Sequence, residues 1–288
     1  MHYAQVFING LMLGGLYACI AVGFSLVWGV LNVINILHGT FVVLGSYVAY
    51  FSYVHLGLHP FLSIPISGAV LFVFAYLVQR GVINRVMGAP VLTTLVLTFG
   101  LDLLLNNAAL LAFSADYRTV QLANPLGSKI VAGLILPLER VWAMALALGL
   151  TGLLYLVLMR SKTGRAIVAV RMDAEAAALM GVNVRRTYAI TFGLGALMAG
   201  AAGSLLSLIF PISPLNSGEF LGLAFVACVL GGLGTVPGAM IGGLALGVIQ
   251  SFGASLIGAE HGLTVAFVLL VLLLIFRPTG IMGRKGYE

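Results

Sequence analysis

Charge is scarce in this sequence, and that scarcity excludes a water-soluble globule. Of 288 residues, 14 are Lys or Arg and 8 are Asp or Glu, so only 8% are charged, against about 25% in an ordinary soluble domain. No charged residue precedes Arg80, and residues 141–159, 187–218 and 220–259 are uncharged as well. An uncharged run of about 18 residues or more can cross the roughly 30 Å core of a bilayer as a helix. The chain is therefore a polytopic membrane protein, which excludes soluble enzymes, nucleic-acid binders and disulfide-rich secreted modules.

Other absences narrow the class further. Alternation at period two over segments of about 10 residues, the pattern of an outer-membrane barrel, is missing. There is no G-x-x-x-x-G-K-[ST] phosphate loop, no H-E-x-x-H motif and no cysteine cluster, so we expect no nucleotide or metal bound by this chain. Cys19 and Cys228 lie in apolar runs and are expected to be buried, without a disulfide. The first ten residues have no basic region and no small-residue cleavage site, so we interpret them as retained sequence.

What is present is a series of long apolar runs, since 61% of the residues are hydrophobic. They predict an all-α fold with about 8–9 transmembrane helices, some broken or re-entrant, in a single domain over residues 1–288. The expected spans are 6–28, 38–56, 61–79, 90–113, 141–159, 188–210, 220–252 and 261–276.

Basic residues predict the orientation of these spans. Cytoplasmic loops carry an excess of Lys and Arg, and eight cations fall after the third span or between the fifth and sixth. They are Arg80, Arg85, Arg160, Lys162, Arg165, Arg171, Arg185 and Arg186. The loop at about 114–140 then lies outside, and Pro125, Gly127 and Pro137 indicate that it is folded.

The seventh run is too long for one straight crossing. Its 33 residues would form a helix of roughly 50 Å, and Gly231–Gly238 interrupt it with Gly234, Pro237 and Gly238. A break there returns Arg277, Arg284 and Lys285 to the cytoplasm. A similar interruption occupies Gly29–Gly39, and paired interruptions of this kind mark translocation sites in transporters.

Small residues recur every four positions in the later spans. They allow helix backbones to approach closely within lipid, which fits either packing inside this chain or a face for a second subunit. The positions are Gly195, Ala199, Gly203, Gly234, Gly238, Gly242, Gly243 and Gly247.

The cytoplasmic loop at about 160–187 contains a helix with its own caps. Asp173 is a favourable N-cap, Glu175 suits the first turn, and Gly181 can take the left-handed C-cap conformation. A connector does not need such a helix, so the loop is expected to dock a partner.

This loop carries a family resemblance. Glu175, Ala176, Ala177 and Gly181 form an E-A-A-x-x-x-G pattern that resembles the coupling motif of ABC importer permeases. The general motif continues to a proline that residues 190–192 lack, which suits the amino-acid branch of these permeases. Three further stretches, residues 29–50, 229–243 and 277–285, match in the expected order. The chain is thus similar to the LivH-type permease subunit of branched-chain amino acid ABC transporters.

The resemblance implies a division of labour among subunits. A second, LivM-like permease, two cytoplasmic ATPases that bind ATP and Mg²⁺, and a periplasmic amino-acid-binding protein would complete the transporter in the inner membrane. This chain would hold no cofactor, and Asp173, Glu175, Ala176, Ala177 and Gly181 would dock the ATPases. A related permease for urea or short amides is one alternative, and an ATPase-independent secondary transporter is another.

Polar residues within the apolar runs are candidates for the substrate pathway. An acid at membrane depth should face protein or water, and Asp102 lies near the middle of its span with Asn106 one turn later. Both could instead anchor neighbouring helices by hydrogen bonds. Asn32, Asn35 and His38 lie at the first interruption, where they could line a path or satisfy freed backbone groups. Gln250 fits an inter-helix hydrogen bond better than a substrate contact.

Overall fold

Helices form nearly all of the structure, a computed structural model that describes residues 1–122, 126–131, 133–277 and 279–282. The α-helices of these residues are α1 (His2–Leu31), α2 (Leu37–Leu56), α3 (Pro60–Gly81), α4 (Val91–Phe113), α5 (Leu138–Arg160), α6 (Lys162–Met172), α7 (Ala174–Leu179), α8 (Val184–Leu206), α9 (Ser217–Gly231), α10 (Val236–Leu256) and α11 (Gly262–Phe276). Short 3-10 helices cover Ile83–Arg85, Pro214–Asn216 and Ala259–His261. Strands β1 (Ser128–Val131) and β2 (Leu134–Pro137) form an antiparallel hairpin in which Ser128 pairs with Pro137.

Nine helices of the described residues are long and apolar enough to cross a membrane. The all-α prediction is confirmed, and so is the interruption of the seventh run, because α9 ends at Gly231 and α10 begins at Val236. The first interruption is confirmed as well, since α1 ends at Leu31 and α2 begins at Leu37. The loop at about 114–140 is folded, as expected, and contains the β1–β2 hairpin; Pro125 lies outside the described residues.

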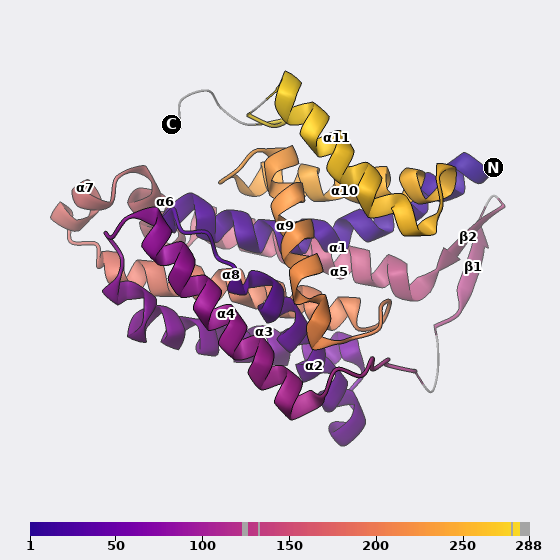
Figure 1. Cartoon of the computed structure of the whole chain (residues 1–288), viewed down its shortest axis with the longest axis horizontal. Coiled ribbons are helices and arrows are strands. Elements are labelled where there is room, and N and C mark those ends of the chain that lie inside the picture. Colours follow the sequence, from indigo (N-terminus) through magenta and orange to yellow (C-terminus); the bar gives the residue numbers. More distant parts are fainter. Residues whose placement is uncertain (123–125, 132, 278, 283–288) are drawn as a thin grey trace.

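Helix α1 runs through the centre of the molecule and packs along α10 (Figure 1). Glycines bring the two backbones together. A Cβ atom at Gly14 would lie 2.7 Å from the carbonyl oxygen of Leu244, and one at Gly247 would collide with the backbone of Gly14. Without side chains between them the helices gain close van der Waals packing, which replaces the hydrophobic effect inside lipid.

Helix α8 packs in the same manner against the first three helices. A Cβ atom at Gly195 would collide with Val27 of α1, and one at Gly203 would collide with the carbonyl of Val42 in α2. Gly242 faces the carbonyl of Ala227 in α9. The small-residue stripes therefore serve packing inside this chain, which was the first of the two interpretations from the sequence.

The two ends of the molecule differ in charge. Helices α6 and α7 lie at the end opposite the N-terminus and the β hairpin (Figure 1). The side-chain amide of Asn84 donates to the carbonyl of Arg185 at 3.1 Å, so the end of α3 and the start of α8 meet there too. All eight cations assigned to the cytoplasm therefore gather at one end, which is called the basic end below.

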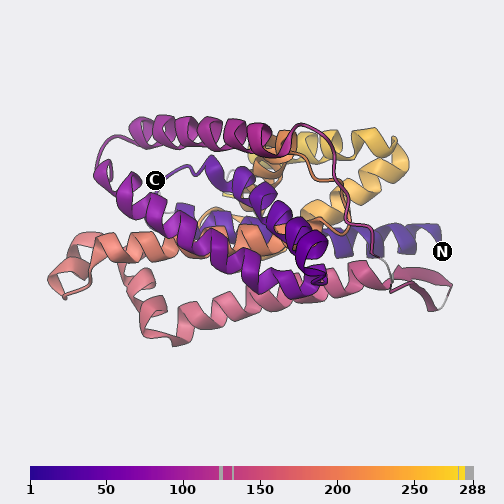
Figure 2. The same ribbon diagram turned by 90° about the horizontal axis from the view of Figure 1, so that it is seen from below.

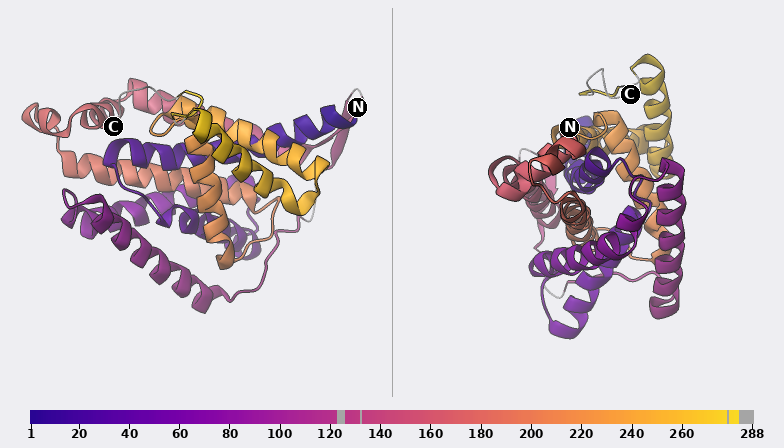
Figure 3. Two further views of the ribbon diagram at one scale, coloured as in Figure 1. Left: turned by 45° about the horizontal axis from the view of Figure 1, so that its top comes forward. Right: turned by 90° about the vertical axis from the view of Figure 1, so that its left-hand side faces the viewer.

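Helix α4 is the most loosely packed of the long helices. It follows one edge of the molecule, opposite the edge formed by α5 and the hairpin (Figure 2). Seen along the long axis, α4 and α11 stand on the same side, and α9 runs between them across the direction of α1 (Figures 1 and 3). This arrangement brings the beginnings of α2 and α9 next to the middle of α4.

Candidate functional site

The coupling segment, defined here as residues 161–183, projects from the basic end and is ordered by its own caps. The Asp173 carboxylate accepts hydrogen bonds from the backbone N–H groups of Glu175 and Ala176, both at 2.9 Å. Gly181 ends the turn with φ of 85°, a left-handed conformation that glycine adopts without strain. The predicted capped helix is confirmed, and it is preceded by α6, whose N-cap Ser161 accepts from Gly164 N at 2.8 Å. The sequence analysis did not predict α6.

The tip of the coupling segment exposes large apolar side chains. Met172, Leu179 and Met180 are 79%, 89% and 85% exposed. Ala177, in contrast, is 5% exposed and belongs to the core. Exposed apolar groups of this kind are typical of contact surfaces between proteins. Ala177 therefore supports the segment from within, whereas the tip formed by Met172, Leu179 and Met180 presents the surface.

The coupling segment also touches the break between α9 and α10. A Cβ atom at Gly234 would lie 4.0 Å from the guanidinium Nη2 of Arg171 and 3.3 Å from Gly29, near the end of α1. The C-terminal residues meet the same break, because Ile281 N donates to Leu230 O at 2.9 Å and Met282 N donates to Gly231 O at 3.0 Å. Arg284 and Lys285 lie outside the described residues.

The break itself is made by glycine. Gly232 and Gly234 have φ of 109° and 79°, and Gly238 packs against the carbonyl of Gly231. The sequence suggested that Pro237 interrupts the run, but Pro237 does not end α9. It occupies the first turn of α10, where the missing N–H needs no partner in the helix.

The polar junction, defined here as Thr40, Asp102, Asn106 and Ser217, connects the middle of α4 to the beginnings of α2 and α9. Thr40 Oγ1 donates to Asp102 Oδ1 at 2.5 Å, and Asn106 Nδ2 donates to Ser217 Oγ at 2.9 Å. Because Asp102 and Asn106 are one turn apart on α4, that helix holds α2 by one side chain and α9 by the next. The side chains predicted from α4 are thus brought together with two that the sequence did not single out.

The beginnings of two helices, α2 and α9, meet at this junction. Gly39 in the first turn of α2 packs directly on Ser217, the first residue of α9. Helix α2 begins without a side-chain cap, so partial positive charge from its first N–H groups remains there. Helix α9 instead continues directly from the 3-10 turn Pro214–Asn216, in which Ser213 Oγ accepts from Leu215 N and Ser217 N donates to Pro214 O.

The candidates at the first interruption have separate environments. Asn32 is the left-handed C-cap of α1, with φ of 52°, and is exposed. Asn35 is 1% exposed, and neither of its amide atoms has a partner among the described residues. His38 is buried against Phe24, and its Nε2 donates to Ile20 O at 2.9 Å. Asn32 and His38 therefore fit the structural interpretation, whereas Asn35 keeps free hydrogen-bonding capacity beside the start of α2.

Gln250 lies elsewhere, beside the Tyr17 hydroxyl where α1 meets α10. Its position fits the inter-helix contact expected from the sequence. Among the described residues, no three His, Cys, Asp or Glu side chains are grouped closely enough to hold a metal ion.

Glu219 is a residue that the sequence analysis missed. It lies exposed in the first turn of α9, and Asn216 Nδ2 donates to its Oε2 at 3.4 Å. The signal was available, because Glu219 is the only charged residue between uncharged runs at 187–218 and 220–259.

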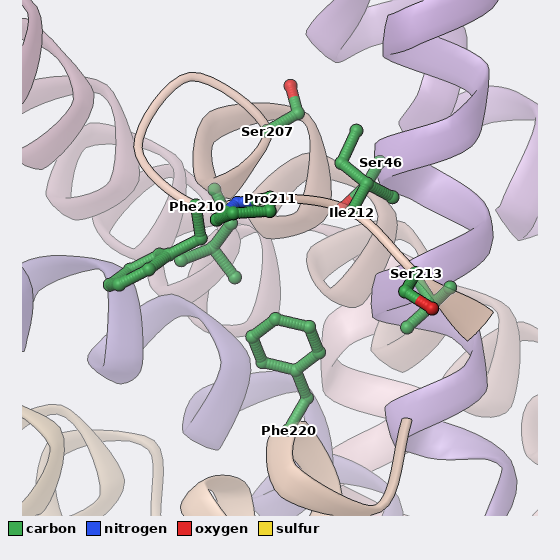
Figure 4. A pocket seen from close by; sticks show the side chains of 9 residues that line it. Ser46, Ser207, Phe210, Pro211, Ile212, Ser213 and Phe220 are labelled. Carbon is green, nitrogen blue, oxygen red and sulfur yellow. The ribbon is translucent and has the colours of Figure 1, made fainter. Parts of the chain in front are cut away.

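A small cavity of about 10 Å³ adjoins the junction, with room for about one water molecule. Ser46 of α2, Phe220 of α9 and the turn from Ser207 to Ser213 line it (Figure 4). Backbone pairing between Arg118 and Ile212 and a hydrogen bond from Ser213 Oγ to Ala115 O hold this turn. The Arg118 guanidinium lies 5.6 Å from the ring centroids of Tyr50 and Phe51, which adds cation–π attraction.

Known proteins have sequences similar to this chain over nearly its whole length. Residues 6–276 match the family described as branched-chain amino acid transport system / permease component. The high-affinity branched-chain amino acid transport system permease protein BraD of Pseudomonas aeruginosa is 34% identical over 300 residues, covering 100% of this chain and 98% of that protein. The corresponding LivH of Escherichia coli K12 is 32% identical over 305 residues, with the same coverage. A probable LivH of Methanocaldococcus jannaschii is 29% identical over 297 residues, which are 96% of this chain and 91% of that protein. No solved structure matches the chain.

Proposed function

Because this chain belongs to the family of branched-chain amino acid transport permeases, we propose that it forms part of the path by which leucine, isoleucine and valine enter the cell. The observation that carries the proposal is the match to the family over residues 6–276, together with relatives aligned over the whole chain. It acts as a non-enzymatic, multi-pass translocation subunit of one domain over residues 1–288.

The polar junction is the proposed place along that path where polar groups contact the passing amino acid. A branched-chain amino acid combines an aliphatic side chain with an ammonium and a carboxylate group. The uncapped start of α2 suits the carboxylate, since helix N-termini attract anions. Asp102 and Glu219 suit the ammonium group, and the unpartnered amide of Asn35 adds a neutral contact. So few polar groups favour brief passage over tight binding, which leaves selectivity mainly to an external binding protein.

The tip of the coupling segment is the proposed docking surface for ATPase subunits. The ATPase subunits, and not this chain, would bind ATP with Mg²⁺ and hydrolyse the ATP. Arg171 extends from α6 to the Gly234 region, so a movement of the docked ATPase has a short route to the break between α9 and α10. A second permease and a periplasmic binding protein complete the proposed transporter.

Orientation follows from the distribution of charge. Since cytoplasmic loops are enriched in Lys and Arg, the basic end would face the cytoplasm and the β hairpin would face outward across the inner membrane. The described residues 281 and 282 meet the break at the basic end, which supports a cytoplasmic C-terminus.

Reconstituted transport tests this proposal. The chain, its second permease, both ATPases and the binding protein are placed in liposomes, and uptake of radiolabelled leucine is measured with and without ATP. We expect ATP-dependent uptake that isoleucine and valine inhibit and that urea and acetamide do not. Inhibition by urea or acetamide would favour the short-amide alternative.

An ATPase subunit that cannot hydrolyse ATP is the matched control. It should assemble normally and abolish leucine uptake. Uptake that survives this change would contradict an ABC importer and favour a secondary transporter.

A further inference from the structure

An open cleft of about 500 Å³ lies at the end of the molecule that carries the N-terminus and the β hairpin. This volume falls within the range of small-molecule sites, roughly 300–1,000 Å³. The cleft is lined by Gln5, Asn9, Ile135, Pro137, Glu139, Arg140, Leu208 and Ile209. It lies between the first turns of α1 and α5, strand β2 and the turn that follows α8.

Hydrogen bonds fix the walls of the cleft. Gln5 of α1 pairs with the backbone of Ile135 in β2, since Gln5 Nε2 donates to Ile135 O and Ile135 N donates to Gln5 Oε1, both at 2.8 Å. Gln5 Nε2 also donates to Asn9 Oδ1 at 3.0 Å. On the other wall, Glu139 Oε1 accepts from Leu126 N at 3.3 Å. The hairpin is therefore tied to α1 and α5, and the cleft is a built feature of the fold.

The lining combines one anion, one cation and an aliphatic surface. Glu139 and Arg140 are successive residues of α5, so their side chains do not face each other along the helix. Since Leu126 N occupies Oε1 of Glu139, its other carboxylate oxygen and the Arg140 guanidinium are the charged groups offered to an external ligand. Ile135, Leu208 and Ile209 supply the aliphatic surface beside them. A ligand that suits this lining has an ammonium group, an acidic group and a short aliphatic chain.

We propose that this cleft is an outer binding site for a free zwitterionic amino acid with an aliphatic side chain. Arg140 contacts the carboxylate, Glu139 contacts the ammonium group, and Ile135, Leu208 and Ile209 contact the side chain. The inference rests on the transport function proposed above and adds a site outside the polar junction. A phosphatidylethanolamine headgroup carries the same pair of charges, so the experiment must separate the two sources.

The position of the cleft fits a site that receives substrate before it enters the helices. Leu208 and Ile209 belong to a turn whose next residues, Phe210–Ser213, line the small cavity beside Phe220 (Figure 4). Four residues after Ser213 the chain reaches Ser217 of the polar junction. A single turn therefore separates the outer cleft from the inner polar groups, and the pairing of Arg118 with Ile212 holds that turn in place.

Cysteine protection tests the site directly. Asn9→Cys and, separately, Leu208→Cys are introduced, and the assembled transporter is purified in nanodiscs that contain phosphatidylglycerol alone. Cys19 and Cys228 of this chain are buried, so labelling of this chain by a charged maleimide reports the new thiol. We expect saturating leucine to slow labelling by about threefold or more, as a ligand that fills the cleft requires. Leucine analogues that lack the amino or the carboxylate group should protect far less.

Matched variants show whether the charges bind the ligand. Arg140→Gln should abolish protection by leucine without changing the labelling rate in its absence. Lys129→Gln makes the same change of charge on β1, outside the lining, and should leave protection intact. Ile130→Cys, whose parent side chain is 74% exposed on the hairpin, should be labelled at one rate with and without leucine.

Each contrary result overturns the proposal. If leucine protects neither Asn9→Cys nor Leu208→Cys, the cleft is not an amino acid site. If nanodiscs that contain phosphatidylethanolamine slow labelling without leucine, and leucine adds nothing, the cleft holds a lipid headgroup. ATP-dependent leucine uptake by the unaltered transporter is measured in parallel, so absence of protection with normal uptake refutes only the cleft. Protection without any uptake would refute the transport role.

Discussion

The carboxylate of Asp102 is held differently from most acids in membrane helices. It has no charged neighbour in the junction and instead accepts a hydrogen bond from Thr40. A hydrogen bond to a charged group contributes about 1.5–3 kcal/mol. An asparagine could accept the same bond through its amide oxygen, whereas a leucine could not.

Substitution of Asp102 should therefore show whether this residue acts in the substrate path or only anchors neighbouring helices. We expect Asp102→Leu to lower the rate of leucine uptake by roughly tenfold, which corresponds to about 1.4 kcal/mol, while assembly and basal ATPase activity persist. Asp102→Asn should lower uptake less. Initial uptake rates in liposomes, with ATPase rates measured in parallel, provide the comparison.

Asn107→Leu is the control for this substitution, because Asn107 is exposed on α4 and, within the described part of the chain, its side chain bonds to Leu103 O of the preceding turn. It should leave uptake unchanged. A transporter that dissociates when Asp102→Leu is introduced would make Asp102 a structural anchor. Unchanged uptake in both Asp102 variants would remove it from the path.

At the scale of elements, the coupling segment combines a rigid base with an exposed apolar tip. Its caps and the burial of Ala177 keep α7 in place, so a change at the tip does not disturb the base. The substitution Ala177→Arg would insert a charge into the core and disturb the whole segment, whereas Leu179 is 89% exposed and can be changed without a folding cost.

Leu179→Asp should weaken association with the ATPase subunits. A hot-spot side chain at the centre of an interface contributes about 2 kcal/mol or more to binding, and the acid also carries a charge into an apolar contact, so we expect at least a tenfold loss of ATPase recovered in pull-downs from membranes. Gly181→Val should have a similar effect, because valine is strained at φ of 85°.

The same apolar-to-acid change at the opposite end, Ile130→Asp, is the control and should leave ATPase recovery unchanged. Recovery at the unaltered level in both Leu179→Asp and Gly181→Val would mean that the ATPases dock elsewhere.

At the scale of the molecule, the number of crossings decides on which side each terminus lies. If all nine candidate helices of the described residues cross, with α9 and α10 counted separately, the two termini lie on opposite sides of the membrane. Met282 is half-exposed and bonded to Gly231 at the basic end. In intact cells, Met282→Cys should therefore resist an impermeant maleimide and react only after the membrane is opened.

Ile130→Cys should show the reverse, reacting in intact cells. Labelling of Met282→Cys from outside would show that residues 220–252 cross the membrane once.

The parts that sequence predicts are those governed by local chemistry. Asp173 and Gly181 can cap a helix wherever it packs, and the length of residues 220–252 with its glycines demands an interruption. The pairing of Thr40 with Asp102 has no local signal, because 62 residues separate them and only the packing of α2 on α4 joins them. Glu219, in contrast, stands out in the sequence as the one charge between two uncharged runs, and only its place in the first turn of α9 needs the structure. The lining of the outer cleft is drawn from four separate elements and leaves no continuous motif.

The glycine contacts between α1 and α10 join residues that are synthesised far apart in time. Gly14 and its partner Gly247 are 233 positions apart in the sequence. At about 5–20 residues per second during synthesis, roughly 12–47 s pass between the emergence of the two. Throughout that interval the groove of α1 that will receive α10 has only lipid, or the insertion machinery, to fill it. The central helix of the finished protein is thus the first to be made and among the last to be enclosed.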